Sequence, residues 1–455
     1  MWRLPLCSSH GAPPENAQYA CHGHGKVTNM PIGVGVIGAG VVGGGTVQTL
    51  LTHRDVIKTR AGVDLALVHV ADLDTSRLSE FDLSGVTTSN DAARLIADPN
   101  VQIVCELIGG HEPARTFILN ALKAGKHVVT ANKMLLASHG PELCRTAIEH
   151  GVELRYEASV AGGIPLIRSI REGLAADRIK AIYGILNGTC NYILSRMTED
   201  GHEFDEALRQ ATALGFAETP PDLDIEGHDT AHKCQILTSL CFSTEVDLDA
   251  LYVEGITRIT HADVAYAGDL GYAIKLLALI QDQGDGIEAR VHPTLVPHGH
   301  QLAAVRNEFN AVYVESDVAG ATLYYGRGAG RFPTASAVVS DVVSIARGLG
   351  APAAPPFVYA EKRPVLDIGA TTSRYYLRLT TLDKPGVLGK VCTLLGNYGV
   401  SIASCIQQEV RDGKPVPVVL MTHETREAEL RKALTEIDQL EFTREATHAI
   451  RVLQE

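Results

Sequence analysis

The stretch PIGVGVIGAGVVGGGTVQTL, residues 31–50, decides the fold of this chain. It begins with the small and branched apolar residues typical of a buried strand and runs directly into GAGVVG, residues 38–43. A strand, a G-x-G-x-x-G turn and a helix form the dinucleotide-binding fingerprint. Gly38 permits the tight turn, Gly40 lets the backbone approach a pyrophosphate, and Gly43 lets the helix pack on the strand. The stretch therefore predicts a site for NAD or NADP at the helix N-terminus, the alternative being a purely structural glycine turn.

The composition limits the class of protein and its partners. A chain of 455 residues with 45% hydrophobic and 20% charged residues has room for two or three globular domains. The net charge of −13 without a basic block argues against nucleic acid or an anionic membrane as a partner, and no apolar run approaches the ~20 residues that span a bilayer. Nine cysteines without a C-x-x-C pair predict reduced thiols in a cytoplasmic protein. Residues 1–30 lack periodicity and are expected to form a disordered tail.

A dinucleotide-binding domain is expected over residues 31–160, built from strands that alternate with helices. Its second strand ends at Asp72, where an acidic residue accepts hydrogen bonds from the cofactor ribose and favours NAD. Two alternatives stay open: Asp72 caps a turn, or the nearby Arg77 reaches a phosphate and favours NADP. Gly109 and Thr130 follow later strands, at the carboxyl edge where ligands of parallel sheets bind.

Lys133 lies at the same edge, and on spacing alone it contacts a ligand or is a solvated lysine. The turn EASVAGGIP, residues 157–165, is expected to expose backbone carbonyls that can ligate a hard cation. Asn187-Gly188-Thr189 at a strand-to-helix junction suits a helix cap or a ligand contact equally well.

Acidic residues and a lysine gather in GFAETPPDLDIEGHDTAHK, residues 215–233. Asp229 and Lys233 lie four residues apart and share one face of an expected helix. Hydride transfer to a carbonyl needs a proton donor beside the oxygen, and no other segment offers one so compactly. The alternative is a solvated acidic loop with an ordinary ion pair.

The following segments are expected to complete the second half of the chain. Residues 269–280, DLGYAIKLLALI, predict a largely buried helix that carries Lys275. Residues 326–330 form a second glycine turn, and the amphipathic helix 335–349 is expected to fold back onto the nucleotide half. The Pro- and Ala-rich residues 350–369 predict a linker. Residues 370–455 then follow the order β-α-β-β-α-β, which is ferredoxin-like.

Several motifs, taken together and in order, resemble homoserine dehydrogenases over residues 32–349. They are GVIGAGVVGGGT, ELIGG, GKHVVTANK, EASVAGGIP, GILNGTCNYIL, the segment 215–233, LGYAIKLL and GRGAGRFPTASAVVSD. With DKPGVLGKV, the last segment resembles the ACT domain, an amino-acid-sensing module that pairs sheets between chains. The resemblance implies an α/β protein: a Rossmann-type domain completed by the helix 335–349, an α+β substrate and dimerisation domain over residues 161–334, and a ferredoxin-like ACT domain.

The resemblance also implies a reaction, the reversible NAD(P)-dependent oxidation of homoserine to aspartate semialdehyde in threonine, methionine and isoleucine biosynthesis. Lys233 is implied as the proton donor and acceptor, and Lys133 as a contact to cofactor and substrate. The implied substrate-binding residues are Glu218, Asp229, Asp224, Thr189 and Tyr192. The implied cofactor-binding residues are Gly38, Gly40, Val41, Val42, Gly43, Asp72, Gly109, Thr130, Lys133, Gly215, Gly328 and Gly330. A sodium ion is implied at Glu157, Val160, Gly162 and Ile164, mostly through carbonyls.

The ACT segment implies feedback inhibition by threonine in a homodimer or homotetramer, the alternative being an ACT fold kept only for oligomerisation. Pro220 departs from the family, which usually has Asp there, and so does Ala71, where many members carry Arg. Two rival hypotheses remain. An aspartate-semialdehyde dehydrogenase needs an acylated cysteine, yet Cys105 and Cys190 stand in apolar or capping contexts. A non-catalytic amino-acid sensor would not need to keep Lys233.

We expect homoserine oxidation to be fastest at alkaline pH. A lysine ammonium beside carboxylates keeps its proton at neutral pH, so Lys233 is a ready acid for aldehyde reduction but must lose its proton to act as a base. Rates of NAD(P) reduction measured from neutral to strongly alkaline pH check this. A flat profile, with chemistry rate-limiting, would count against Lys233 as the base.

Overall fold

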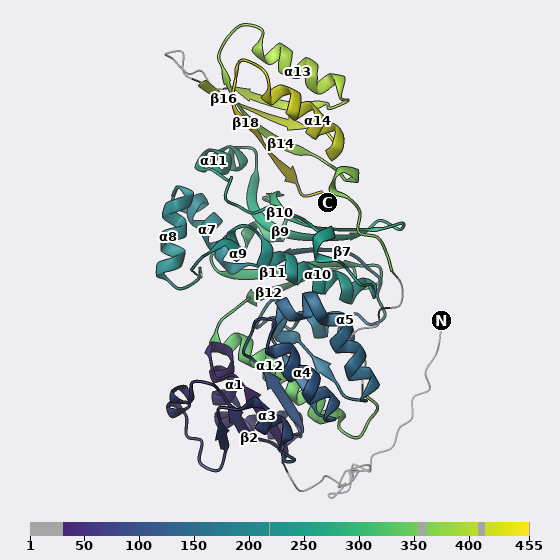
Figure 1. Cartoon of the computed structure of the whole chain (residues 1–455). Helices are drawn as coiled ribbons and strands as arrows, with labels where there is room; N and C mark the ends of the chain where they lie inside the picture. Colours follow the sequence, from purple (N-terminus) through teal and green to yellow (C-terminus); the bar gives the residue numbers. More distant parts are fainter. Residues whose placement is uncertain (1–30, 218, 354–358, 360–361, 408–414, 455) are drawn as a thin grey trace, which may run out of the picture.

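The computed structural model describes residues 31–217, 219–353, 359, 362–407 and 415–454. The tail expected for residues 1–30 lies outside this part of the chain. Three units follow one another along the long axis of the molecule, with the nucleotide unit, the central unit and the C-terminal unit from bottom to top of Figure 1. Within the described ranges, no helix is both long and apolar enough to cross a membrane.

A six-stranded parallel sheet forms the core of the first unit, in the order β3-β2-β1-β4-β5-β6. Its strands are β1 Ile32–Ile37, β2 Leu65–Ala71, β3 Thr87–Ser89, β4 Ile103–Glu106, β5 His127–Thr130 and β6 Leu154–Arg155. Its helices are α1 Val41–Thr52, α2 Arg54–Ala61, α3 Ala92–Ala97, α4 Ala114–Lys123 and α5 Lys133–Glu149. Because the strands are parallel, their carboxyl ends meet at one edge, where α1 and α5 begin.

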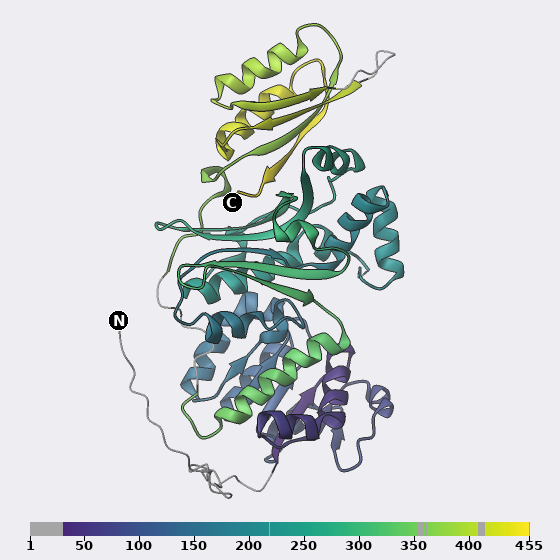
Figure 2. The same cartoon turned by 180° about the vertical axis from the view of Figure 1, so that it is seen from behind.

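The glycine turn holds α1 against β1. Gly38 has a φ of +92°, which a side chain rarely adopts. A Cβ atom on Gly43 would lie 1.8 Å from the Gly38 carbonyl oxygen, so only glycine fits there. The later helix α12, Arg331–Gly348, packs on α1 and comes closest at Gly45, where a Cβ would lie 2.5 Å from the Arg331 carbonyl oxygen. Figure 2 shows this green helix lying beside the purple α1.

The central unit is built on a mostly antiparallel sheet in the order β12-β11-β7-β9-β10. Its strands are β7 Ile179–Ile185, β9 Tyr272–Asp282, β10 Ile287–Pro297, β11 Phe309–Ser316 and β12 Ala321–Arg327, and β8 Tyr252–Val253 pairs with β10. Its helices are α6 Leu166–Arg168, α7 Gly188–Glu199, α8 Phe204–Ala213, α9 Asp222–Ile225, α10 His228–Phe242 and α11 His261–Asp269. Helices α7, α10 and α11 pack against β9.

The helix predicted for residues 269–280 is wrong, because this segment forms β9. The strand lies between β7 and β10 and is buried on both faces. Ile274 and Leu276 join the core beneath the helices, whereas Leu277 and Leu279 join a second cluster on the other face. A strand buried on both faces has no polar alternation, so its apolar run has the same pattern as a buried helix.

The C-terminal unit has the predicted β-α-β-β-α-β order and the strand order β18-β14-β16-β15. Its elements are β14 Tyr375–Leu382, α13 Val387–Asn397, β15 Ile402–Gln407, β16 Pro415–Thr422, α14 Glu427–Asp438 and β18 Thr443–Val452, with a small pair formed by β13 Thr372–Ser373 and β17 Thr425–Arg426. The end of the expected linker contacts the central unit, since the Ile287 amide donates to the Pro364 carbonyl at 2.9 Å.

The central and C-terminal sheets are continuous. Strand β18 pairs in parallel with β10, with Thr294 opposite Arg451 and Leu295 opposite Val452. The yellow β18 therefore lies against the teal central strands in Figure 1.

A buried acid reinforces this junction. Asp263 of α11 is fully buried and accepts hydrogen bonds from Arg378 Nε at 2.7 Å, Tyr376 Oη at 3.1 Å and His448 Nδ1 at 3.3 Å. Burial opposes the charge of Asp263, but the bonds from His448 and Arg378 outweigh it and hold the pKa of the carboxyl below its usual range.

We expect Asp263→Asn to lower the free energy of unfolding by about 3 kcal/mol, because the half-buried Arg378 guanidinium loses its close carboxylate and, among the described residues, keeps only Glu445, 4.0 Å away. Denaturant unfolding of the two proteins measures this. Since the pKa of Asp263 is lowered by folding, the difference should be full above pH ~4 and shrink as the pH falls further. Asp269→Asn, an exposed change on the same helix, is the matched control. Equal stability of the Asp263 variant and the control would contradict the prediction.

Candidate active site

A cavity of about 630 Å³ opens at the carboxyl edge of the parallel sheet. Of the residues predicted to bind a cofactor, Gly38, Gly40, Asp72 and Gly109 line it. The cavity suits a dinucleotide, because Gly38 and Gly40, the N-cap of α1, line it and the helix N-terminus therefore borders it.

Asp72 both lines the cavity and organises its wall. One carboxylate oxygen accepts from the Ala39 amide of the glycine turn at 2.5 Å, and the other accepts from the Asp74 amide at 2.8 Å. The turn-cap interpretation of Asp72 therefore holds, together with its place in the cavity. Arg77 also lines this cavity, with its guanidinium 3.9 Å from Asp72 and its side chain 53% exposed.

The remaining predicted cofactor residues of the first unit lie behind or beside the cavity. Val41 is exposed at the start of α1, Val42 is half-buried and Gly43 is buried. Thr130 is fully buried and donates to Glu106 Oε2 at 2.7 Å, outside the cavity lining.

Glu106 is a residue that the sequence analysis missed, although it begins the ELIGG motif. It is fully buried, and its Oε1 accepts from the amides of Ile108 at 2.9 Å and Gly109 at 3.4 Å. Burial raises the pKa of Glu106, while these bonds and Thr130 act against that shift. Glu106 thus fixes the backbone of the loop that lines the cavity.

A second cavity, of about 500 Å³, lies where α5, α7, α10 and the 328–330 turn meet. Many of the predicted residues line it: Lys133, Thr189, Gly215, Asp224, Asp229, Lys233, Gly328 and Gly330. Residues that are far apart in the sequence and belong to two units are therefore brought to one site.

Asp229 joins the two predicted catalytic lysines. Its Oδ2 accepts from Lys233 Nζ at 2.6 Å, and its Oδ1 lies 3.2 Å from Lys133 Nζ. Asp229 is only 7% exposed, so burial disfavours its charge, but the two ammonium groups hold the pKa of its carboxyl well below the usual range. One carboxylate thus anchors a lysine from each unit.

Local structure explains how these groups are held. Lys233 follows Asp229 by one helical turn on α10, and its Nζ also donates to the Leu186 carbonyl at 2.7 Å. Asn187 caps α7, accepting from the Cys190 amide at 2.8 Å, while its Nδ2 donates to Asp224 at 2.7 Å and to Asp229 at 2.9 Å. The helix-cap interpretation of this junction is confirmed, and Asn187, Gly188 and Thr189 also line the cavity.

Lys133 is the first residue of α5 and is positioned by the residue before it. Asn132 caps the helix by accepting from the Leu135 amide at 3.1 Å, and its Nδ2 donates to the Gly110 carbonyl at 2.6 Å. The loop after β4, which lines the first cavity, is therefore tied to the helix that lines the second.

Two further predicted substrate residues, Thr189 and Tyr192, contact Phe216. Thr189 lines the cavity while its hydroxyl donates to the Phe216 carbonyl at 2.7 Å. Tyr192 lies outside the cavity lining, with its ring 5.1 Å from that of Phe216. Glu218 lies outside the described residues.

The turn predicted to bind sodium is buried beside the second cavity. Glu157 caps α6, because its two carboxylate oxygens accept from the amides of Ile167 at 2.9 Å and Arg168 at 2.8 Å. Gly162 abuts the 328–330 turn, where an added Cβ would lie 2.3 Å from the Gly328 carbonyl oxygen. Val160 and Ile164 are buried. No group of three or more His, Cys, Asp or Glu side chains suited to a metal occurs in the described ranges, so a cation here would depend on main-chain oxygens, as hard cations accept.

The sequence analysis also missed residues on the far wall of the second cavity. Glu308, Asn310 and Arg327 line it, and Arg327 Nη1 donates to Glu308 at 2.9 Å. Asn310 of β11 lies opposite Gly326 of β12, at the start of the predicted glycine turn. Antiparallel pairing of consecutive strands, a common arrangement, is the signal that could have placed Asn310 there.

The site can therefore hold a polar substrate between two ammonium groups and several carboxylates, next to a dinucleotide cavity. Such a set suits proton transfer at a substrate oxygen coupled to hydride transfer.

Family models match three parts of the chain. Residues 38–157 match the NAD-binding domain of homoserine dehydrogenase, residues 165–343 match the homoserine dehydrogenase model, and residues 375–442 match the ACT domain. The homoserine dehydrogenase of Neisseria gonorrhoeae is 42% identical over 429 residues, which cover 93% of this chain and 98% of that protein. The homoserine dehydrogenase of Pseudomonas aeruginosa is 43% identical over 434 residues, covering 93% and 99%.

Solved structures agree with these sequence matches. A homoserine dehydrogenase from Thiobacillus denitrificans superimposes with a TM-score of 0.87 at 41% identity, covering 93% of this chain and 98% of that one. The homoserine dehydrogenase of S. aureus gives a TM-score of 0.73 at 32% identity, covering 93% and 99%.

We expect Asp229→Asn to lower kcat by about 100-fold or more, because the neutral amide no longer holds both ammonium groups in place for proton transfer. Steady-state rates at saturating substrate measure this, with circular dichroism to verify folding. Asp222→Asn, at an exposed position seven residues earlier, is the control and should keep the wild-type rate. A folded Asp229 variant with undiminished kcat would remove Asp229 from the mechanism.

Proposed function

The chain belongs to the homoserine dehydrogenase family, and from this membership we propose which of its residues interconvert L-homoserine and L-aspartate 4-semialdehyde. The observation that carries the proposal is the Asp229 carboxylate, to which Lys133 and Lys233 reach from different units of the fold. NAD(P), held by the glycine turn and the loop after β4, would supply the hydride acceptor or donor. The chain's own residues then bind the substrate and move the proton.

Lys233 is proposed as the proton donor in reduction and the acceptor in oxidation. Two of its three N–H groups are engaged, by Asp229 and by the Leu186 carbonyl, which leaves one for the substrate oxygen. Lys133, with its side chain 37% exposed at the cavity, is proposed to contact substrate and cofactor together.

Carboxylates are proposed to bind the amino end of homoserine, since an ammonium group pairs best with charged acceptors. Asp224 and Asp229 supply them in the cavity, with Glu218 as a further carboxylate and Thr189 beside them. Tyr192 is proposed to act through Phe216, whose ring it contacts and which lines the cavity. The cofactor set extends to Gly215, Gly328 and Gly330, which line the same cavity.

The finer features of the family are also part of the proposal. A sodium ion would be held by the carbonyls of the Glu157–Ile164 turn, because the Glu157 carboxylate is already used as a helix cap. The ACT unit is proposed to bind threonine and to inhibit the enzyme within a homodimer or homotetramer in the cytoplasm. We also propose domain limits at residues 31–160, 161–334 and 370–455, with α12 completing the first domain.

The direct test is the change in NAD(P)H absorbance with homoserine and, in the reverse direction, with aspartate semialdehyde. We expect activity in both directions and inhibition by added threonine in the full-length chain. A chain lacking residues 365–455, if folded, should keep activity and lose the threonine effect. Inactivity with both substrates contradicts the proposed reaction, and threonine inhibition that survives the deletion contradicts the regulatory role of the ACT unit.

A further inference from the structure

Lys275 is a buried lysine that the proposed reaction does not use. It lies in the middle of β9 and is 4% exposed. Its Nζ donates to Asn191 Oδ1 at 3.0 Å and to the Val305 carbonyl, and both acceptors are uncharged. The nearest influential charges are Arg306 and Glu199, which act on Lys275 in opposite directions. Burial lowers the pKa of Lys275 to about 8, so the protein interior opposes its charge.

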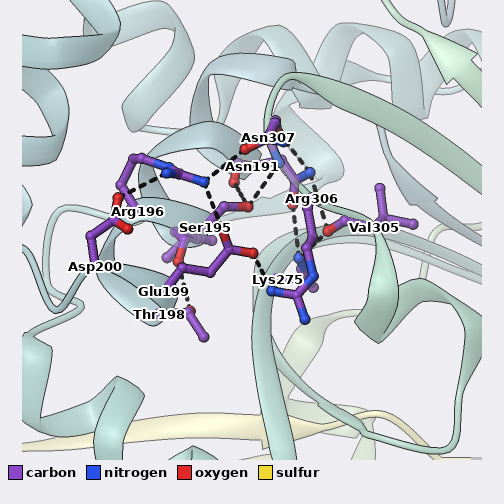
Figure 3. A network of polar contacts seen from close by, with 11 residues as sticks. Asn191, Ser195, Arg196, Thr198, Glu199, Asp200, Lys275, Val305, Arg306 and Asn307 are labelled. Carbon is purple, nitrogen blue, oxygen red and sulfur yellow. Dashed lines mark hydrogen bonds and ion pairs between the residues drawn. The ribbon is translucent and has the colours of Figure 1, made fainter.

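Asn191 connects Lys275 to the turn formed by residues 305–309. Its Nδ2 donates to the carbonyls of Asn307 at 2.9 Å and Phe309 at 3.1 Å, and lies 3.4 Å from that of Val305. Asn191 is 2% exposed on α7. One amide and one ammonium thus hold the backbone of residues 305–309, and Figure 3 shows their contacts with residues 305–307.

Three further contacts hold the same turn against α7 (Figure 3). The Asn307 amide donates to Ser195 Oγ at 3.0 Å, and Asn307 has a φ of +55°, which non-glycine residues rarely adopt. Arg196 Nη2 donates to Asn307 Oδ1 at 2.8 Å, and Arg306 pairs with Glu199. A strained residue persists only where its surroundings over-determine it.

The turn leads directly into the active site. Glu308 and Asn310 line the second cavity together with Lys133 and Lys233. The fit to α7 is tight, because a Cβ on Gly188 would lie 2.6 Å from the Glu308 carbonyl oxygen. A shift of this turn would therefore move the cavity wall and disturb the first turn of α7.

A hydrophobic residue at position 275 would match its surroundings, since Leu277 and Leu279 on the same strand face pack in an apolar cluster. Burying an amine without a countercharge is unfavourable. A lysine is therefore expected at this position only if its hydrogen bonds have a role. What a lysine offers here is two donors aimed at Asn191 and Val305.

We propose that Lys275 is a positioning residue for the substrate cavity: it fixes residues 305–309 against α7 and so sets the places of Glu308 and Asn310. The inference rests on the proposed function only in taking this cavity as the homoserine site.

The test is Lys275→Met in the full-length enzyme, with Asn191→Leu as a second variant that removes the bond between the two residues and also the bonds from Asn191 to the carbonyls of residues 305–309. We expect KM for homoserine to rise about tenfold or more, the equivalent of one lost charge-assisted hydrogen bond, with KM for the cofactor unchanged. A purely structural role would not separate the two constants. The effects of the two changes should be less than additive in the double variant, because the bond between Lys275 and Asn191 is lost in either single variant.

Lys126→Met is the matched control. Lys126 is also buried and also bonded only to carbonyls, those of Asp98 at 2.8 Å and Val101 at 2.5 Å, but it lies in the nucleotide unit. It should leave KM for homoserine unchanged.

Amide hydrogen exchange provides a readout that is independent of activity. In the Lys275→Met or the Asn191→Leu variant, whichever folds, the backbone amides of residues 306–310 should exchange faster than in the wild-type protein. In the Lys126→Met variant their exchange should be unchanged. Folded variants with an unchanged KM for homoserine and unchanged exchange would overturn the inference. An inactive wild-type enzyme would instead contradict the proposed function, and exchange would still decide the role of Lys275.

Discussion

The site depends on one carboxylate shared between two lysines. Asp229 and Lys233 belong to α10 of the central unit, whereas Lys133 begins α5 of the nucleotide unit. The pairing therefore exists only while the two units keep one relative position. The packing of α10 against α5, where Gln235 Nε2 donates to the Ala137 carbonyl at 2.8 Å, serves that end. Because these groups are buried, the loss of any partner would leave a charge uncompensated at a high cost in free energy. The charges, the helix caps and the interface between the units therefore depend on one another.

Four lysines described above have two kinds of hydrogen-bond partner, charged carboxylates or neutral oxygens. Each kind of partner suits a different role. Lys133 and Lys233 stand at a cavity wall beside a carboxylate, where an ammonium can exchange a proton or hold a charged ligand. Lys126 and Lys275 are enclosed and donate to neutral oxygens, which suits a group that fastens loops. A lysine motif in sequence does not distinguish these cases, because the difference lies in the partners, which come from distant segments.

How far the sequence predicts the structure depends on whether the information is local. The glycine turn, the i, i+4 spacing of Asp229 and Lys233 and the order of elements after residue 370 are local patterns, and each predicted its element correctly. The segment 269–280 was misassigned because burial on both faces erases alternation. Glu308 and Asn310 went unnoticed because strand pairing brings them to the second cavity, and Glu106 because its bonds to the amides of Ile108 and Gly109 form only when the loop closes. The residues next to them in the sequence do not indicate these placements.

The pairing of β18 with β10 has a consequence for how the molecule is made. During synthesis β10 leaves the ribosome well before β18, so the part of its edge beyond β8 stays open while the linker and the C-terminal unit are still being translated. An open strand edge is a template for pairing with another chain. The nascent protein thus passes through a period in which a chaperone or a wrong neighbour can occupy the place reserved for its own last strand.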